Sequence, residues 1–256
     1  MALLEVDGLC KSFGGLQAVN AVSFEVPNGA IKAVIGPNGA GKTTLFNLIA
    51  GSLPADSGTI AFDGRSIYGT PSHRIADLGI ARTFQNVKIF RQMTVLENIL
   101  VGAHTRSRGG VTACMLRLPF TRSEETRVRD RAYELLDMLD IAELADEDAS
   151  MLAFGQQRAV ELARALALEP KLLLLDEPAA GLNIRETAGL GEMIRSIRDL
   201  DITVLIVEHD MSLIMDISDE ITVLNFGSKI AEGPPQEVQR DPEVIRVYLG
   251  DEDAES

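Results

Sequence analysis

Residues 36–43, GPNGAGKT, constrain this sequence more than any other segment, because their glycines and their lysine-threonine pair stand between two strongly apolar stretches. The stretch before them, AIKAVIG, has the continuous apolar pattern of a strand covered on both faces, and TTLFNLIAG after them has a helical pattern. Glycines let such a loop wrap closely enough for backbone N–H groups to point at phosphate oxygens. The segment matches GxxxxGK[ST] in the required position, so it predicts a site for nucleotide phosphates.

We expect backbone and side chains of this loop to share the binding. The Lys42 ammonium can bridge the β- and γ-phosphates, Thr43 offers a hydroxyl to Mg²⁺, and the helix start adds its positive dipole. The expected nucleotide-binding residues of the loop are Gly36, Pro37, Asn38, Gly39, Ala40, Gly41, Lys42, Thr43 and Thr44. The alternative is a glycine-rich turn that happens to match, and the motif alone leaves kinases, GTPases and ATPases open.

Two further apolar strand patterns end in polar residues that suit phosphate chemistry. LLLLDEP places Asp176 at the carboxyl end of a strand, where it can hold the Mg²⁺ shell, and Glu177 beside it, where it can polarise a water. TVLIVEH repeats the arrangement and brings His209 to the same sheet edge. The alternatives are an exposed acidic turn and a structural histidine, and the phosphate loop favours the catalytic interpretation.

Composition limits the fold and the partners. With 256 residues, 46% of them hydrophobic, the chain is long enough for one large domain or one domain with an inserted lobe. A net charge of −14 argues against nucleic acid, because phosphate contacts need clustered Lys and Arg. Cys10 and Cys114 belong to no CxxC pair, so we expect a reducing compartment and no disulfide framework or cysteine metal site.

Hydrophobic runs and the N-terminus bear on location. The first residues include Glu5 and Asp7 and lack a basic start followed by an apolar core, so we expect no signal peptide. No run approaches the ~18 apolar residues of a spanning helix. We therefore expect any membrane association to go through a partner.

Strand and helix patterns predict a lobe inserted into an α/β core. Strand patterns precede and follow a long helical stretch, and two buried strands joined through a helix imply a parallel sheet. Asn183-x-x-Glu186 is expected to cap that helix, and Thr121-x-x-Glu124 to open a helix of the lobe. The expected boundaries are 1–86 and 160–250 for the nucleotide-binding α/β core, 87–159 for the inserted helical lobe with the LAFGQ segment and 251–256 for an acidic tail.

Charge is uneven within the lobe. Residues 104–131 contain seven arginines and three acids, whereas residues 132–150 contain seven acids and no Lys or Arg. A solvated helix pair with complementary faces is the simpler interpretation, and a docking surface for a partner or for lipid headgroups is the alternative.

Taken together, the motifs resemble those of ATP-binding-cassette (ABC) ATPases. GPNGAGKTT, the glutamine of GIARTFQN, GQQR followed by ELARAL, LLLLDEP and His209 occur in the order and approximate spacing of that family. The resemblance runs from Phe13 to the last helix. It implies an α/β fold of the P-loop NTPase class and ABC ATPase type, with a mostly parallel core sheet, an antiparallel β portion and an inserted helical lobe. It also implies ATP and Mg²⁺ as cofactors.

The resemblance assigns roles to single residues. Phe13 corresponds to the aromatic residue that stacks on adenine, and Gln85 to the glutamine that reaches Mg²⁺ and the attacking water; read alone, they are a core phenylalanine and a loop amide. AGLN, residues 180–183, stands where the family, usually with SALD, touches the opposite subunit. By resemblance, catalysis falls to Lys42, Gln85, Glu177 and His209, and metal binding to Thr43, Gln85 and Asp176.

Residues 152–156, LAFGQ, stand in place of the family signature LSGGQ, which binds the γ-phosphate of a nucleotide held by a second subunit. Ala153 removes the hydroxyl, but Gly155 and Gln156 can still present backbone N–H groups at a helix start. We therefore expect Ala153, Phe154, Gly155 and Gln156 to form this contact mainly through backbone amides, with Phe154 packing. An ordinary helix start is the alternative.

Finer features are most similar to ATPase subunits of high-affinity branched-chain amino acid importers of bacteria and archaea. These features are the aromatic-GQQR form, DEPAAGLN, an insertion near 104–131 and FGSKIAEGPPQEV. The resemblance implies a second ABC ATPase subunit, identical or different, integral-membrane permease subunits that receive the motion near residues 85–95, and indirectly a substrate-binding protein. It implies a peripheral location on the cytoplasmic face of the membrane. The alternatives are a soluble ABC ATPase acting on nucleic acid or ribosomes and a non-hydrolysing ATP-sensing module.

Overall fold

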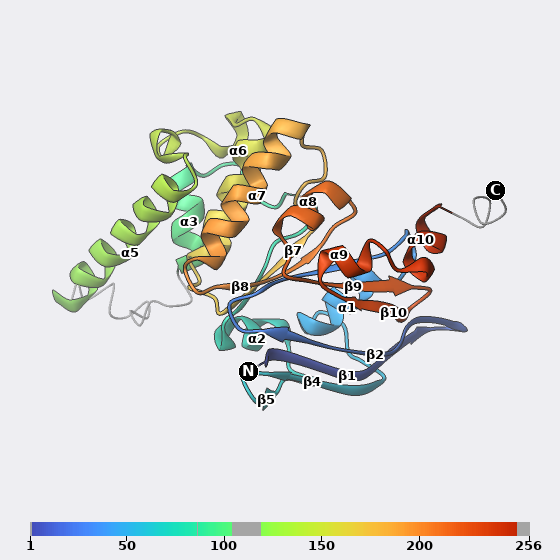
Figure 1. Cartoon of the computed structure of the whole chain (residues 1–256). Coiled ribbons are helices and arrows are strands. Elements are labelled where there is room, and N and C mark those ends of the chain that lie inside the picture. The colour runs from blue at the N-terminus through green and yellow to red at the C-terminus, as the bar shows by residue number, and fades with distance from the viewer. Residues whose placement is uncertain (1, 86, 104–118, 250–256) are drawn as a thin grey trace. The chain divides into compact units, whose positions relative to one another are not determined.

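The structure is a computed structural model that describes residues 2–85, 87–103 and 119–249 (Figure 1). The chain separates into two compact units, one of residues 1–82 with 171–256 and one of residues 83–170. The second unit is longer at both ends than the expected lobe of 87–159, and at its C-terminal end it includes the whole helix that begins within the LAFGQ segment.

The first unit contains an antiparallel sheet in the order β2-β1-β4-β5 among the described residues. Its strands are β1 (Ala2–Phe13), β2 (Leu16–Pro27), β4 (Ser57–Phe62) and β5 (Arg65–Ser66). Along the first part of β1, Leu4 and Val6 are buried while Glu5 and Asp7 are exposed. This is the alternation expected of a strand with one face in the core and one in water.

The second sheet of this unit has the order β10-β9-β3-β8-β7-β6 in the part of the chain that the structure describes. It comprises β3 (Ile31–Ile35), β6 (Ile80–Arg82), β7 (Leu172–Asp176), β8 (Thr203–Val207), β9 (Glu220–Asn225) and β10 (Ser228–Gly233). All pairs are parallel except β9 with β10. Every residue of β3, β7 and β8 is buried, as their continuous apolar patterns predict. The predicted α/β class is confirmed.

The first unit also contains helices. They are α1 (Lys42–Ile49), α2 (Ser72–Leu78), α7 (Ile184–Arg198), α8 (Met211–Ile217), α9 (Pro235–Val238) and α10 (Pro242–Leu249). One core cluster joins Phe46 of α1 with residues of both sheets, Leu4 of β1 and Leu205 of β8 among them. The predicted capping box of α7 is confirmed. The Asn183 side chain accepts from the N–H of Glu186, whose carboxylate accepts from the N–H of Asn183.

The second unit is helical where it is described. It contains α3 (Val95–Ala103), α5 (Pro119–Met138), 3₁₀ turns at Ala142–Leu144 and Ala149–Met151, and α6 (Phe154–Leu166). Gly102 lets α3 approach α6, because a Cβ there would lie 2.2 Å from the Arg164 carbonyl oxygen. The chain is already helical at Pro119, so the prediction that Thr121 opens this helix is wrong. The arginine-rich segment lies outside the described residues over 104–118.

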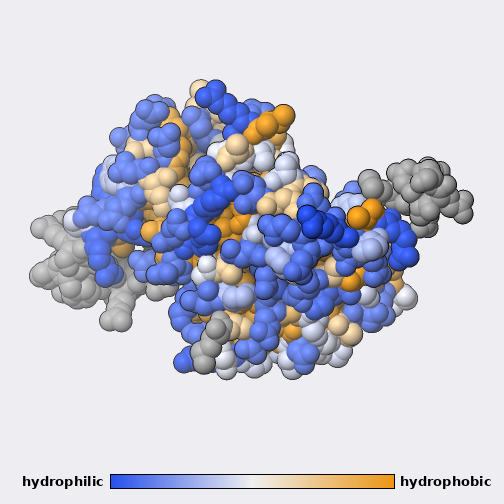
Figure 2. Space-filling model, viewed as in Figure 1, coloured by the Kyte–Doolittle hydropathy of each residue, from blue (hydrophilic) through white to orange (hydrophobic). Residues whose placement is uncertain are grey.

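The surface of the protein is mostly hydrophilic on one face (Figure 2). On the face seen in Figure 2, hydrophilic residues predominate, and hydrophobic residues are scattered among them. Among the described residues, no helix is long and apolar enough to span a bilayer.

Candidate active site

Two glycines shape the phosphate loop through contacts inside the first unit. Gly36 has φ +152°, and a Cβ on it would lie 2.2 Å from the Leu224 carbonyl oxygen. Gly41 has φ +101°, and a Cβ there would lie 2.2 Å from the Ala18 carbonyl oxygen. Any other residue at either position would push the loop away from β9 or β2. Glycine is therefore required by packing as well as by backbone conformation.

Lys42 lies inside this loop. Its Nζ donates to the carbonyl oxygens of Gly36 at 2.6 Å and Pro37 at 3.1 Å, and the residue is buried. Burial lowers the pKa of Lys42, while the nearby carboxylates of Glu177 and Asp176 act in the opposite direction. The loop thus holds the ammonium ready to contact a phosphate.

A cavity of about 390 Å³ opens beside the loop in the first unit. The predicted residues that line it are Phe13, Asn38, Gly39, Ala40, Gly41, Lys42, Thr43, Thr44 and Glu177. Four further residues that were not predicted from the sequence also line it: Leu16, Gln17, Ala18 and Phe226. Gly36 and Pro37 are not among the lining residues; they accept hydrogen bonds from Lys42 instead.

The two acids at the end of β7 have different surroundings. The buried Asp176 carboxylate lies 2.7 Å from the Arg82 guanidinium, which also donates at 2.7 Å to the Asn47 side chain. Glu177 is half-buried and has φ +47°, a conformation that costs energy for a residue with a side chain. Its N–H donates to the Val207 carbonyl oxygen at 2.8 Å. That bond holds the strained residue at the edge of the cavity.

Glu208, which was not predicted as a site residue, organises the ends of β7 and β8. Its fully buried carboxylate accepts from the N–H of Ala179 at 2.6 Å and from the N–H groups of His209 and Asp210 at 2.9 and 3.4 Å. The exposed His209 imidazole lies 3.8 Å from the same carboxylate. The loops that carry Glu177 and His209 therefore share one buried acceptor.

In the second unit, the LAFGQ segment forms the start of α6. The N–H of Ala153 donates to the Gln156 side chain at 2.9 Å, and the Gln157 side chain donates to the Leu152 carbonyl oxygen at 2.9 Å. Alanine has no oxygen to return the first bond, so only half of a capping box is present. The half-exposed Gly155 and Gln156 lie in the first turn, where backbone N–H groups have no acceptor within the helix. Phe154 is exposed, and the Arg158 guanidinium lies 5.7 Å from its ring centre.

A buried ion pair of α6 holds the segment that contains Gln85. Arg158 and Glu161 lie 3.0 Å apart, both buried. Arg158 donates to the carbonyl oxygens of Phe84 and Gln85 at 2.9 and 3.1 Å. Glu161 accepts from the N–H groups of Phe84 and Lys88 at 3.4 and 3.3 Å. The Gln85 backbone is thereby fixed to the helix that begins with the LAFGQ segment, while its side chain is exposed.

Comparison with known proteins identifies the family. A model described as ABC transporter matches residues 19–180, more than half of the chain. The chain belongs to the ABC transporter family. A second model, described as branched-chain amino acid ATP-binding cassette transporter, matches residues 228–254. This ABC ATPase is thus an enzyme of ATP hydrolysis that serves a transporter.

Relatives of this ABC ATPase match it along nearly its whole length. The high-affinity branched-chain amino acid transport ATP-binding protein LivG of Salmonella typhimurium is 46% identical over 97% of this chain and 98% of that protein. The corresponding protein BraF of Pseudomonas aeruginosa is 44% identical with the same coverage. A solved ABC transporter cassette in its ADP conformation has a TM-score of 0.85 and 33% identity, and the match covers 98% of this chain and 99% of that one.

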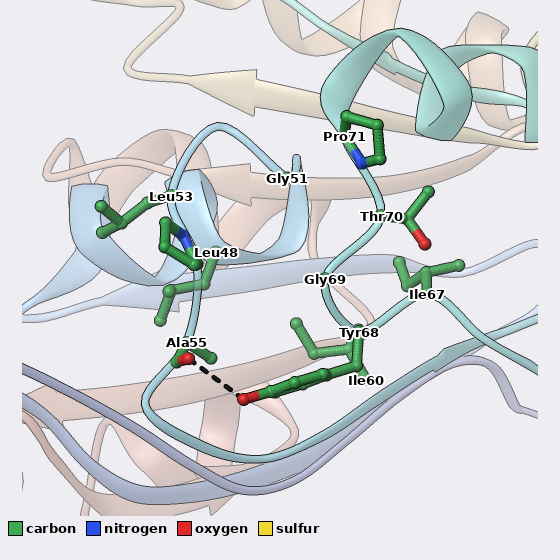
Figure 3. A pocket seen from close by; sticks show the side chains of 11 residues that line it. Leu48, Gly51, Leu53, Ala55, Ile60, Ile67, Tyr68, Gly69, Thr70 and Pro71 are labelled. Atoms are coloured by element: carbon green, nitrogen blue, oxygen red, sulfur yellow. Dashed lines mark hydrogen bonds between the residues drawn. The ribbon is translucent and has the colours of Figure 1, made fainter.

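A second, smaller cavity of the ABC ATPase has a different chemistry. Its volume is about 100 Å³, and it lies between the end of α1 and the β4–β5 region (Figure 3). Leu48, Ile60 and Ile67 are among its lining residues, and the Tyr68 hydroxyl donates to the Ala55 carbonyl oxygen at 3.1 Å. No lining residue carries a charge at neutral pH. This cavity is therefore unsuited to a triphosphate, which the loop cavity with Lys42 can hold.

The donors beside the phosphate loop fit Mg²⁺. Thr43 offers a hydroxyl and Asp176 a carboxylate, and Mg²⁺ in phosphate sites is held by one or two such oxygens together with substrate phosphates and water. Over the described ranges, no cluster of three His, Cys, Asp or Glu residues forms an all-protein metal cage. The donor set therefore suits a magnesium ion that arrives with the nucleotide.

Proposed function

We propose that this chain is the ATPase of a high-affinity importer for branched-chain amino acids in bacteria or archaea. The observation that carries the proposal is the C-terminal match to the branched-chain amino acid cassette model, together with 44–46% identity to LivG and BraF. The chain supplies ATP-driven motion, and other subunits recognise the substrate.

ATP binds in the loop cavity of the first unit under this proposal. Phe13 stacks on the adenine, and the loop amides with Lys42 hold the phosphates. Thr43 and Asp176 would hold Mg²⁺, with Gln85 as a further proposed contact, and the ion would supply positive charge beside the phosphates. The residues that line the cavity position the triphosphate, and the half-buried Arg82 guanidinium fixes the orientation of the Asp176 carboxylate.

Hydrolysis is assigned to residues that follow β7 and β8. Glu177 takes a proton from the attacking water, because its carboxylate lines the cavity next to the loop. His209 contacts the γ-phosphate from the end of β8, and the Glu208 hydrogen bonds set its backbone position. Departure of phosphate then weakens the contacts that keep the site closed.

Two cassettes form a complete pair of sites. The amides of Gly155 and Gln156, with Ala153 and Phe154 beside them, bind the γ-phosphate of ATP held by the opposite subunit. Residues 180–183 touch that subunit. The partner is a second copy or a sister ATPase, and integral-membrane permease subunits hold the pair at the cytoplasmic face of the membrane. A substrate-binding protein delivers cargo from the other side.

Affinity capture from membranes of the native host tests the proposal. We expect two hydrophobic permease chains and a sister ATPase to co-purify, and the captured complex to release phosphate from ATP. Co-purification with ribosomes or DNA instead would show a soluble ABC ATPase of another kind. Binding of ATP without phosphate release from the intact complex would show a sensing module.

A substitution within residues 85–95 makes the capture experiment specific for the expected docking segment. The Phe90 side chain is exposed, but its backbone N–H and C=O are both bound by the Asn98 side chain, at 2.8 and 3.0 Å. Phe90→Ser therefore changes the surface and leaves the loop in place. We expect it to reduce permease capture while ADP binding to the isolated subunit stays unchanged. If Phe90→Ser captures as much permease as the wild-type protein, docking near residues 85–95 is contradicted.

A further inference from the structure

The turn between β9 and β10 breaks a local rule of hairpin chemistry. Asn225 pairs with Ser228, so the loop between the strands has two residues, Phe226 and Gly227. Both have positive φ, +43° and +80°. Positive φ at both positions is the property of a type I′ turn, which favours Asn, Asp or Gly at the first of them. A bulky aromatic residue there is conformationally costly.

Neighbouring segments fix this turn in place. The N–H of Gly227 donates to the Ala40 carbonyl oxygen of the phosphate loop at 3.0 Å, and the Gly227 carbonyl accepts from the N–H of Asn20 in β2 at 2.7 Å. A Cβ on Gly227 would lie 2.9 Å from the Ala18 carbonyl oxygen. Phe226 is therefore carried on a backbone that is bound to the phosphate loop on one side and to β2 on the other.

The Phe226 side chain gains little from the chain's own packing. It is 85% exposed, although it lines the loop cavity together with Phe13 and Leu16, which are 48% and 69% exposed. The residue thus combines a strained backbone with an apolar surface in water, and both are unfavourable in the isolated subunit. Strained residues of this kind cluster at ligand sites, where binding offsets their cost. A flat apolar ligand group at the cavity edge would cover the ring.

We propose that Phe226 forms a second aromatic contact for the base of the bound nucleotide, supplied by the β9–β10 turn, in addition to Phe13. The inference rests on the proposed nucleotide site and adds a residue to it. The ligand class is a nucleotide, because stacking on an aromatic ring strengthens binding of a flat base. Stacking does not read the edge of the base, so Phe226 adds affinity without choosing between bases.

Calorimetric titration of the isolated subunit with ADP and with inorganic pyrophosphate tests this assignment. Both ligands offer a diphosphate, and only ADP carries a base. For Phe226→Ala we expect an ADP Kd about tenfold higher, equivalent to about 1.4 kcal/mol, and an unchanged pyrophosphate Kd. The control Tyr68→Ala removes another exposed aromatic ring of the same unit, at the separate cavity of Figure 3, and leaves both constants unchanged.

Phe226→Asn separates the role of the ring from that of the fold. Asparagine tolerates positive φ, so we expect a higher Tm than wild type together with the same loss of ADP affinity. The proposal is overturned if the ADP affinity of the Phe226 variants stays within twofold of wild type. It is also overturned if ADP and pyrophosphate are weakened equally. Failure of the wild-type subunit to bind ADP would instead refute the nucleotide site itself.

Discussion

The Glu208 carboxylate accepts a 2.6 Å hydrogen bond from the backbone N–H of Ala179, and this bond joins the loop after β7 to the loop after β8. The same carboxylate accepts from the N–H of His209 at 2.9 Å. A fully buried acceptor that serves both loops makes the positions of Glu177 and His209 interdependent. Movement of either loop must therefore be transmitted to the other or break a buried hydrogen bond, which costs about 1–3 kcal/mol.

Glu208→Gln tests this link. The amide keeps the size of the side chain but replaces one acceptor oxygen by a donor that faces backbone N–H groups. We expect kcat for ATP hydrolysis to fall about tenfold or more while the ADP Kd changes less than about threefold, consistent with losing about 1–3 kcal/mol of loop positioning. Phosphate release and ADP titration measure the two effects. Glu208→Asp keeps both oxygens and should retain more activity than Glu208→Gln; the reverse order would contradict the link.

Ala153→Ser tests what the missing signature hydroxyl does. Ala153 has the extended backbone of a helix N-cap, φ −62° and ψ 156°, and already donates to the Gln156 side chain. Serine would complete the capping box, which stabilises by about 1 kcal/mol and raises Tm by about 2–4 °C. Because backbone amides carry the phosphate contact in our account, phosphate release should change less than about threefold. A rise of tenfold or more would assign the contact to the hydroxyl. Ala188→Ser, at an exposed alanine inside α7, provides the control without a Tm gain.

Substitutions of Arg158 test how α6 holds Gln85. Arg158→Ala leaves the buried Glu161 carboxylate without its partner, so we expect a loss of about 3–5 kcal/mol in the free energy of unfolding. Arg158→Lys keeps the charge but lacks the planar fork that reaches the Phe84 and Gln85 carbonyls together. It should keep most of the stability and reduce phosphate release severalfold. Thermal unfolding measures the stability, and phosphate release measures the activity. If Arg158→Lys hydrolyses ATP at the wild-type rate, the hydrogen bonds from Arg158 to the Phe84 and Gln85 carbonyls serve stability only.

The elements that sequence predicted best are those whose residues face one kind of environment along their whole length. The strands β3, β7 and β8 are fully buried and read as unbroken apolar runs, so their place in a parallel sheet was predictable. The α7 cap was predictable because Asn183 and Glu186 complete it within one turn. The start of α5 was predicted wrongly because a capping pattern also occurs inside helices.

Residues that act across long sequence separations could not be predicted. Arg82 meets Asp176, 94 positions away, and no local pattern marks that pair. Glu208 reads as a polar residue after a strand, and only its bond to Ala179 shows that it is a shared acceptor. Phe226 did leave a trace in the sequence. Phe-Gly occupies a two-residue hairpin where Asn-Gly is preferred, and that departure marks the position.

The pH dependence of nucleotide binding should report the burial of Lys42. Burial lowers the pKa of Lys42 in the folded chain below the 10.5 of the unfolded chain. Between these two pKa values the unfolded chain binds more protons than the folded chain. The contribution of Lys42 to the free energy of unfolding therefore rises with pH over that window. Phosphate needs the ammonium form, so ADP affinity should fall over the same window below 10.5, and binding should take up a proton. Calorimetry in buffers of different ionisation enthalpy measures that uptake. Lys42→Ala should lose nucleotide binding, and unchanged affinity would remove the assigned role.

The most direct test of the account concerns the active centre that two cassettes complete. The measurement is the molar mass of the Glu177→Gln variant by light scattering, alone or mixed with the ATPase that co-purifies with it, with and without Mg²⁺-ATP. We predict a mass near 27.7 kDa without nucleotide and about twice that value with ATP, because the variant binds ATP but does not open the closed pair. The exposed-site variant Glu192→Gln should hydrolyse ATP and accumulate no such pair. A Glu177→Gln subunit that binds ATP, stays at the mass of one cassette and releases phosphate at the wild-type rate would contradict the account.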